Sequence, residues 1–444
     1  MAESVAKYQQ YEEYKDSGVE WSEKIPTHWK TASLSKLFMI KAGGDLQPAL
    51  FSETKTLEHQ HPIYTNANDS KAVYGYTKKP NFPSNTITVS GRGEVGFAVY
   101  RNHEFDAIIR LLVLIPFIKL DGRFFAYFIN EVIDFNVQSS AIGQLSTLQI
   151  SPYKVIIPPY EEQHLISNYL DHETAQIDTL IEKQQTLIQL LKEKRQAVIS
   201  HAVTKGLNPN VSMKESGVEW LGEVPEGWEV LRLKHLIISL DSGCSVNAAD
   251  TPAQENEIGV LKTSCVYTRT FRVEENKTVF KEDLNRVKCP IRKGAIIISR
   301  MNTPDLVGAS AIIGVDANNI FLPDRLWQTN FNNKFDLTPK FLAYFMTIRG
   351  FRNQISLAAE GASSSMQSIS KEDYLSINCI LPPIKEQQEI VKHIEDMQSK
   401  FNDLVNNAEQ AIQLMQERRT ALISAAVTGK IDVRGWVALD SNAE

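Results

Sequence analysis

Two pairs of repeated segments constrain the fold of this 444-residue chain more than any other feature. The first pair, YKDSGVEWSEKIPTHW from Tyr14 and MKESGVEWLGEVPEGW from Met213, shares SGVEW and then a matched Pro and Trp. The second pair begins at Ile157 and Leu381 and aligns Glu-Gln at 162–163 with Glu-Gln at 386–387 without a gap. Repeats that stay in register predict one structural plan used twice.

The intervals between the repeats diverge, apart from FFAYFI at Phe124 and FLAYFM at Phe341. Short apolar runs separated by turn residues predict strands there, including NTITVSGRGEVGFAVY, AIIRLLVLI and GAIIISRMNTPDLVGASAIIGV. We therefore predict an α+β chain with two mixed α/β domains, two long antiparallel coiled-coil helices and an internal pseudo-two-fold repeat. The predicted parts are a first domain with the N-terminal repeat segment at 1–157, a central helical spacer at 158–206, a second domain at 207–381, a distal helical spacer at 382–430 and a tail at 431–444.

Each predicted long helix follows a Pro-Pro pair and ends at a glycine, Gly206 or Gly429. Apolar residues alternate at spacings of three and four along both segments, which predicts a seam between the two helices. The seam residues expected to pack helix on helix or against another subunit are Leu180, Leu187, Leu191, Phe401, Leu404 and Met415. The pattern fits a rigid spacer between domains, and it also fits a coiled coil used only for oligomerisation.

The net charge of −6 does not suggest a nucleic-acid-binding protein, because such domains are usually basic. The acidic excess lies outside the divergent segments, however. Residues 38–157 hold 11 Lys and Arg against 10 Asp and Glu, and residues 237–381 hold 16 against 15. The charge of these two domains therefore permits DNA binding through local basic faces.

Compartment signals are few. No apolar run reaches the roughly 18 residues of a membrane span, and the N-terminus lacks the pattern of a signal peptide, so a cytoplasmic protein is expected. The four cysteines, Cys244, Cys265, Cys289 and Cys379, lie in the second divergent segment without C-x-x-C spacing, which predicts reduced structural thiols.

Several strings imitate catalytic motifs without completing them. GRGEVG at Gly91 precedes a strand-like run instead of a helix, so a glycine turn is expected in place of a dinucleotide site. The Pro-Pro-Tyr at 158–160 lacks the preceding Asn or Asp of an amino-methyltransferase motif, and no phosphate loop or metal-spaced His pair occurs. We expect no catalytic residue, metal site or cofactor on this chain.

Polar and basic loop residues in the divergent domains are the candidates for DNA contact. In both domains an apolar strand ends in Ser and Arg before a glycine loop, and hydroxyl- and amide-rich loops follow later. Such side chains contact phosphates and base edges, although a solvated turn explains each loop equally well. The candidates are Lys78, Lys79, Arg92, Gln144, Ser146, Thr147, Arg286, Lys288, Arg292, Lys293, Arg300, Asn302, Ser364, Ser365 and Gln367.

The repeated segments, together with EKRQAVISHAVTKG and ERRTALISAAVTGKID, resemble the specificity subunit of type I restriction-modification systems over essentially the whole chain. That resemblance implies two target-recognition domains, each binding half of a bipartite double-stranded DNA site. It also implies two methyltransferase subunits for adenine N6 methylation and restriction subunits for cleavage. S-adenosylmethionine, ATP and magnesium would then be bound by the partner subunits. Recognition domains diverge within the family, so no DNA-contacting residue carries over by motif.

On this interpretation the repeated segment attaches both domains in the same way to the same kind of partner subunit. Trp21, Trp29, Trp220 and Trp228 are expected to pack as core residues near each domain's start, with partner contact as the alternative. Two other hypotheses remain open: an interaction scaffold whose domains bind proteins, and a single-chain enzyme with an unrecognised active site.

Overall fold

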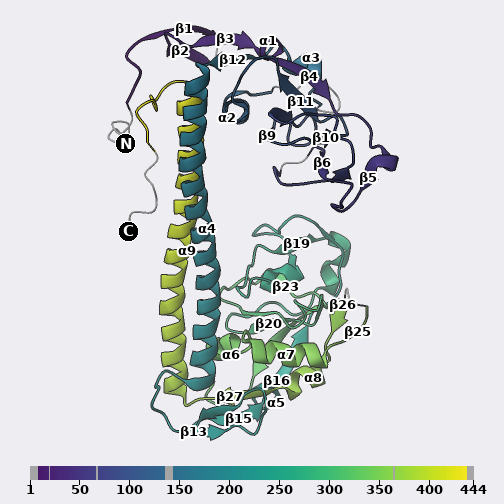
Figure 1. Cartoon of the computed structure of the whole chain (residues 1–444). Helices are drawn as coiled ribbons and strands as arrows, with labels where there is room; N and C mark the ends of the chain where they lie inside the picture. The colour runs from purple at the N-terminus through teal and green to yellow at the C-terminus, as the bar shows by residue number, and fades with distance from the viewer. Residues whose placement is uncertain (1–8, 20, 67–68, 136–143, 364–365, 438–444) are drawn as a thin grey trace. The chain divides into compact units, whose positions relative to one another are not determined.

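The computed structural model describes residues 9–437 except 20, 67–68, 136–143 and 364–365. The chain divides into two compact units, one formed by residues 1–185 with 409–444 and the other by residues 186–408 (Figure 1). Each unit contains one divergent domain and a portion of both long helices, α4 (Tyr160–Lys205) and α9 (Ile384–Val427). Among the described residues, no helix has the length and apolar character needed to cross a membrane.

The first unit begins with the repeated hairpin and continues into two four-stranded sheets. Its elements besides the long helices are β1 (Tyr14–Val19), β2 (Ser22–Pro26), β3 (Lys30–Ser33), α1 (Leu34–Leu37), β4 (Phe38–Ala42), η2 (Pro48–Leu50), β5 (Phe51–Ser52), β6 (His61–Tyr64), β7 (Gly75–Thr77), β8 (Thr86–Val89), β9 (Ala98–Arg101), β10 (Asp106–Ala107), β11 (Leu112–Pro116), α2 (Gly122–Val132), α3 (Thr147–Ile150) and β12 (Lys154–Ile157).

The second unit repeats this order with additional helices and an additional three-stranded sheet. Its elements besides the long helices are β13 (Met213–Glu215), β14 (Glu223–Pro225), β15 (Glu229–Arg232), α5 (Leu233–Leu236), β16 (Ile237–Ser242), β17 (Ala248–Ala249), β18 (Gly259–Leu261), η3 (Thr263–Val266), β19 (Asn276–Val279), η4 (Lys281–Arg286), β20 (Ile296–Ser299), β21 (Met301–Asn302), β22 (Ser310–Ile312), β23 (Ile320–Phe321), β24 (Leu326–Phe331), α6 (Pro339–Phe345), α7 (Arg349–Ala358), β25 (Glu360–Ser363), β26 (Met366–Ser368), α8 (Lys371–Ser376) and β27 (Asn378–Leu381).

The two divergent domains share one sheet topology although their sequences barely match. The strand order β4-β11-β8-β9 of the first corresponds to β16-β24-β20-β22 of the second, and β10-β6-β7-β5 corresponds to β23-β18-β19-β17. Each second sheet contains a parallel pair at the same place, β6 with β10 and β18 with β23. The internal repeat predicted from the duplicated segments is therefore confirmed, and it extends through the divergent parts.

The central strand of each first sheet shows why these apolar runs form strands. Side chains alternate between the two faces of a strand. Ile296 and Ile298 of β20 accordingly join the core under α6, whereas Ile297 joins a second core on the opposite face. An uninterrupted apolar run suits a strand that is covered on both sides. In the first unit, Phe124 and Phe128 of α2 cover Ile87 of β8 in the same way.

A glycine permits the close approach of the two sheets in each unit. A Cβ added to Gly43 would lie 2.5 Å from the carbonyl oxygen of Ala107, and one added to Gly243 would lie 1.6 Å from that of Leu322. Both glycines follow the first strand of a first sheet, β4 or β16. No residue with a side chain fits there without displacing backbone.

The apolar run from Ala107 does not form one strand, contrary to the sequence prediction. It is divided between β10 and β11 by a turn in which Ile109 and Arg110 both have positive φ angles, 55° and 60°. Ile109 is 46% exposed, so this part of the run is not buried. The Gly91–Gly96 segment, by contrast, joins β8 to β9, as predicted for a glycine turn.

The long helices pack against each other antiparallel within each unit. In the first unit, Ile166 and Leu170 of α4 share a core with Ile423 and Ala426 of α9. In the second, Ile199 and Val203 of α4 share a core with Ile390 and Ile394 of α9. Ion pairing adds to this, since the Arg419 guanidinium of α9 lies 3.0 Å from the Asp178 carboxylate of α4.

Only part of the predicted seam is buried. Leu191 and Phe401 are buried, and Met415 is partly buried against the core. Leu180, Leu187 and Leu404 are 49%, 43% and 49% exposed, so contact of these three side chains with another subunit stays a prediction. A 3.6-residue helix drifts out of a strict 3.5-residue repeat, which turns some seam positions toward solvent.

Candidate nucleic-acid interface

The repeated tryptophans anchor each domain to the start of a long helix. Trp29 is fully buried and donates its indole N–H to the Glu162 carboxylate, with 3.1 Å between the atoms. Trp228 is 1% exposed and donates to the Glu386 carboxylate at 2.9 Å. In the first unit Tyr11 and His28 also hydrogen-bond Glu162. The repeated Trp and Glu are therefore one contact made twice.

The repeated glutamines make a second matched contact. The Gln163 side chain accepts a hydrogen bond from the Asp121 backbone N–H at 3.0 Å, and Gln387 accepts one from the Thr338 N–H at 2.7 Å. Asp121 and Thr338 are the N-cap residues of α2 and α6. Each glutamine also donates to a carbonyl of its own Pro-Pro segment. The Glu-Gln pair thus connects each long helix with both the repeated segment and the FFAYFI-type helix.

The first tryptophan of each repeat lies closer to the surface. Trp21 is 39% exposed and packs edge-on against Phe128. Trp220 is half-buried, and its ring contacts Phe345 and Gly350. All four tryptophans have packing contacts within their own unit, and Trp21 has the most exposed side chain of the four.

An equivalent loop follows the central strand of each first sheet. In the first unit the loop runs from Ser90, and the Gly96 N–H donates to the Ser90 carbonyl at 2.8 Å. In the second it runs from Ser299, and the Gly308 N–H donates to the Ser299 carbonyl at 2.6 Å. Gly96 and Gly308 have φ angles of +93° and +67°, which favour glycine. The two Ser-Arg loops singled out in the sequence are structural counterparts.

In the first unit this loop meets the later hydroxyl-rich loop. Arg92 donates to the Gln144 side chain at 2.9 Å, and the Leu145 N–H donates to the Gly91 carbonyl at 2.9 Å. Ser146 caps α3, because its hydroxyl accepts from the Gln149 N–H. Its hydroxyl therefore has a structural role that the sequence prediction missed, and Thr147 occupies the first turn of α3. Arg92 and Gln144 remain candidates for DNA contact.

In the second unit the corresponding loops pair as strands. Asn302 of β21 lies opposite Gln367 of β26, and the Ile369 N–H donates to the Arg300 carbonyl at 3.1 Å. Gln367 is therefore adjacent in space to Arg300 and Asn302, although it is far from them in sequence. Ser364 and Ser365 lie outside the described residues. The Arg300 Nε and Gln367 Oε1 atoms are buried and have no hydrogen-bond partner among the described residues.

Tyr267, which sequence analysis did not single out, completes this group. The Asn302 side-chain amide donates to the Tyr267 hydroxyl at 2.8 Å, and that hydroxyl also hydrogen-bonds Thr263 at 2.8 Å. Tyr267 lies directly after η3, more than thirty residues from Asn302. No local sequence pattern marks a tyrosine brought to a site by tertiary folding.

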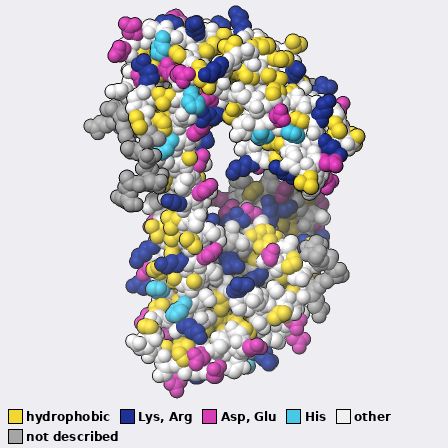
Figure 2. Space-filling view, viewed as in Figure 1, with side chains coloured by type: hydrophobic (Ala, Val, Ile, Leu, Met, Phe, Trp, Pro, Cys, Tyr) yellow, Lys and Arg dark blue, Asp and Glu magenta, His cyan; other side chains and the backbone are white. Residues whose placement is uncertain are grey.

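Most of the other basic candidates are paired with carboxylates. Lys78 pairs with Glu58, Arg286 with Asp283 at 2.8 Å, Arg292 with Asp241 at 3.1 Å and Lys293 with Asp316 at 3.1 Å. Lys79 and Lys288 are exposed. Figure 2 likewise shows basic and acidic side chains interspersed on the face in view.

Arg292 also has an electrostatic role within the second unit. Burial alone would raise the pKa of Asp241, but hydrogen bonds from Asn330, Ser239 and Arg292 hold it below its usual value. Arg292 and Lys293 precede β20, whereas Arg300 follows it, so they lie at opposite ends of this strand. The structure therefore does not bring the basic run 286–293 together with Arg300, Asn302 and Gln367.

The Arg92 and Arg300 loops present amides, hydroxyls and guanidinium groups. Amide side chains can pair with the edge of adenine, and guanidinium groups can pair with guanine or phosphate. The cysteines are unpaired thiols, with Cys265 and Cys379 buried. Within the described ranges, no group of three or more His, Cys, Asp or Glu side chains is placed to hold a metal ion.

Comparison with known families identifies the class of protein. The model of the type I restriction modification DNA specificity domain matches residues 26–190 and again residues 225–414. These matches cover most of the chain and one falls on each repeat. The chain therefore belongs to the family of type I restriction-modification specificity subunits.

Individual relatives carry the same description. The EcoKI specificity subunit of Escherichia coli K12 is 26% identical over 336 residues, covering 72% of this chain and 68% of that protein. The EcoDI specificity subunit of Escherichia coli is 22% identical over 428 residues, covering 92% and 90%. The match to the Escherichia coli EcoEI specificity subunit is 26% identical but spans 46% of this chain and only 34% of that protein.

Solved structures share the fold. A chain from a study of complex assembly and conformational transition in a type I R-M system aligns with a TM-score of 0.68 at 12% identity, covering 92% of this chain and 99% of that one. The HsdS subunit of Thermoanaerobacter tengcongensis aligns with a TM-score of 0.52 at 13% identity, covering 92% and 98%. At such identities the likeness concerns the fold alone.

Proposed function

We propose that this chain is the non-catalytic subunit that recognises a bipartite double-stranded DNA site in a type I restriction-modification complex. Each divergent domain binds one half-site. The chain positions two methyltransferase subunits for adenine N6 methylation and restriction subunits for cleavage. S-adenosylmethionine, ATP and magnesium bind to those partner subunits.

The observation that carries the proposal is one sheet topology bearing two different sets of loop side chains. Equivalent loops carry Arg92 and Gln144 in the first unit, and Arg300, Asn302 and Gln367 in the second. Shared scaffolds with different surface residues suit the reading of two different short sequences. The methyltransferase would have to flip its target adenine out of the duplex, since the amino group is inaccessible while the base is stacked.

The competing hypothesis is a scaffold whose domains bind proteins instead of DNA. Membership of a DNA specificity family favours the DNA-binding role. The exposed Trp21 face and the half-exposed Leu180 and Leu404 are available for protein contacts. In the proposed complex these apolar surfaces contact the methyltransferase, so protein binding and DNA binding belong to different parts of the chain.

Duplex binding by the complex of this chain with its methyltransferase tests the proposal. We expect the logarithm of the binding constant to fall linearly with the logarithm of salt concentration, because phosphate contacts release counterions. The methyltransferase without this chain, measured on the same duplex, serves as the control. An intact complex whose duplex binding is no tighter than that of the methyltransferase alone would favour the scaffold.

A further inference from the structure

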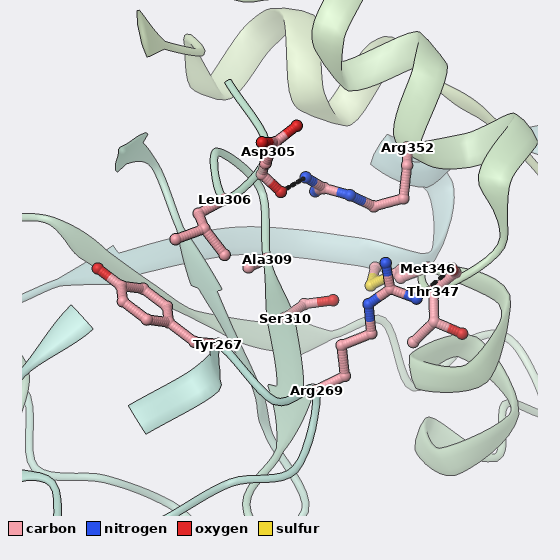
Figure 3. A pocket seen from close by; sticks show the side chains of 9 residues that line it. All are labelled: Tyr267, Arg269, Asp305, Leu306, Ala309, Ser310, Met346, Thr347 and Arg352. Carbon is pink, nitrogen blue, oxygen red and sulfur yellow. Dashed lines mark hydrogen bonds between the residues drawn. The ribbon is translucent and has the colours of Figure 1, made fainter. Parts of the chain in front are cut away.

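The second unit contains a hollow of about 60 Å³ that two arginine side chains line (Figure 3). Arg269 reaches it from the turn after η3, and Arg352 reaches it from the first half of α7. The loop that holds Asp305 and Leu306 and the residues Met346 and Thr347 form its other walls. The space is larger than a single water requires.

Both guanidinium groups are held by neutral acceptors. Arg269 donates to the Thr347 carbonyl at 3.1 Å and to the Gln196 side chain at 3.3 Å. Arg352 donates to the backbone carbonyl of Asp305 at 3.0 Å, and its Nη1 is buried without a hydrogen-bond partner among the described residues. Among the described residues, neither Arg269 nor Arg352 forms an ion pair with a carboxylate. The hollow thus concentrates two positive charges and holds at least one unused donor.

The two charges also disfavour each other. Burial lowers the pKa of Arg352 and the nearby Arg269 lowers it further, whereas Tyr374 and Asp305 act in the opposite direction. Arg269 has a φ angle of +61°, an uncommon conformation for a residue with a side chain, and such backbone strain clusters at functional sites. A bound anion would relieve the repulsion and accept from the unused N–H.

We propose that Arg269 and Arg352 form a clamp for one phosphodiester group of the DNA backbone. The proposal rests on the DNA-recognition role proposed above and assigns two residues of the second domain to it. Guanidinium groups suit phosphate because their N–H donors match its oxygens in pairs. The hydroxyl group of Ser310 on the same walls can supply a further donor.

The position of the hollow favours DNA over other anions. Tyr267 lines it and also hydrogen-bonds Asn302, which lies opposite Gln367. The clamp is therefore one side chain away from the amides that are candidates for base contact. Phosphate contacts fix the register in which neighbouring side chains meet the bases.

This clamp distinguishes the second domain from the first. A Cβ added to Gly308 would meet Ile355 and the Arg352 guanidinium, whereas one added to the equivalent Gly96 would meet the Phe135 ring. The same turn of the fold is therefore covered by an aromatic ring in one unit and by an arginine-bearing helix in the other.

The test is duplex binding, over a range of salt concentrations, by the full complex carrying Arg269→Gln or Arg352→Gln. We expect each variant to raise Kd about tenfold at low salt and to reduce the salt slope by about one. Arg352→Lys should retain most of the slope, because it keeps the charge. Lys334→Gln, which removes one charge from an exposed turn of the same unit, should leave Kd and slope unchanged.

A second measurement locates the phosphate. Single neutral methylphosphonate linkages are placed in turn along a duplex that wild type binds, and one linkage should weaken wild-type binding but have no further effect on Arg352→Gln. Unchanged Kd and slope in both Gln variants, with wild type binding normally, overturn the clamp alone. An unchanged slope with loss of the copurifying methyltransferase overturns it in favour of an acidic protein partner. Absence of salt-dependent binding by wild type would remove the proposed function as well.

Discussion

At the residue scale, the repeated tryptophans and glutamates are explained by one buried hydrogen bond per unit. A buried indole N–H needs an acceptor, because leaving a donor unpaired costs about 1–3 kcal/mol. Glu162 and Glu386 supply this acceptor from the first turns of α4 and α9. Replacing either the Trp or the Glu alone breaks this hydrogen bond and lowers the free energy of unfolding. This accounts for the occurrence of the Trp and the Glu together in each copy of the repeat.

Replacing Glu386 by Ala should destabilise the second unit. The change leaves the Trp228 indole without its acceptor, so we expect the free energy of unfolding to fall by about 1–3 kcal/mol. Thermal unfolding of the complex measures this as a lower apparent Tm. Glu389→Ala, three residues along the same helix at an exposed position, should change stability by less than about 0.5 kcal/mol. Equal effects of the two changes would contradict the proposed anchor.

The sequence singles out some of these residues and gives no sign of the others. Repetition singled out Trp29 and Trp228, and both side chains are buried within their own unit. It did not reveal that Glu162 and Glu386 were the partners, because an acidic residue early in a helix is commonly an exposed favourable charge. Arg269 and Arg352 carry no sequence signal, since they meet only after η3 and α7 fold together.

At the element scale, topology persists where residues do not. The sheets of the two divergent domains have the same strand order, although FFAYFI and FLAYFM are nearly the only matched string between them. Strands require alternation and burial more than particular side chains, so different residues build the same sheet. Strand boundaries were less predictable, as the turn at Ile109 and Arg110 shows.

The long helices provide a matched pair of positions for a stability measurement. Phe401 is 4% exposed and Leu404, one turn further, is 49% exposed. Phe401→Ala should therefore cost about 3–5 kcal/mol, whereas Leu404→Ala should cost about 1 kcal/mol or less. Thermal unfolding of both variants in the complex compares them. A larger loss for Leu404→Ala would show that the seam follows the regular heptad predicted from the sequence.

At the scale of the whole molecule, the first compact unit is assembled from two separate parts of the chain and the second from one continuous part. The first unit takes residues 1–185 and 409–444, and the second takes the continuous stretch between them. Both long helices therefore contribute to both units. Because the divergent domains share a sheet topology but barely match in sequence, we assign specificity to them and partner attachment to the repeated segments and helices.

The most direct test of bipartite recognition is a genome-wide map of N6-methyladenine. The chain is co-expressed with its methyltransferase in a host without adenine methylation, and single-molecule sequencing locates the modified bases. We predict a new split motif with two short defined halves around an undefined gap of fixed length. Methylation at a continuous motif, or none from a soluble copurifying complex, would contradict recognition of two half-sites by two domains.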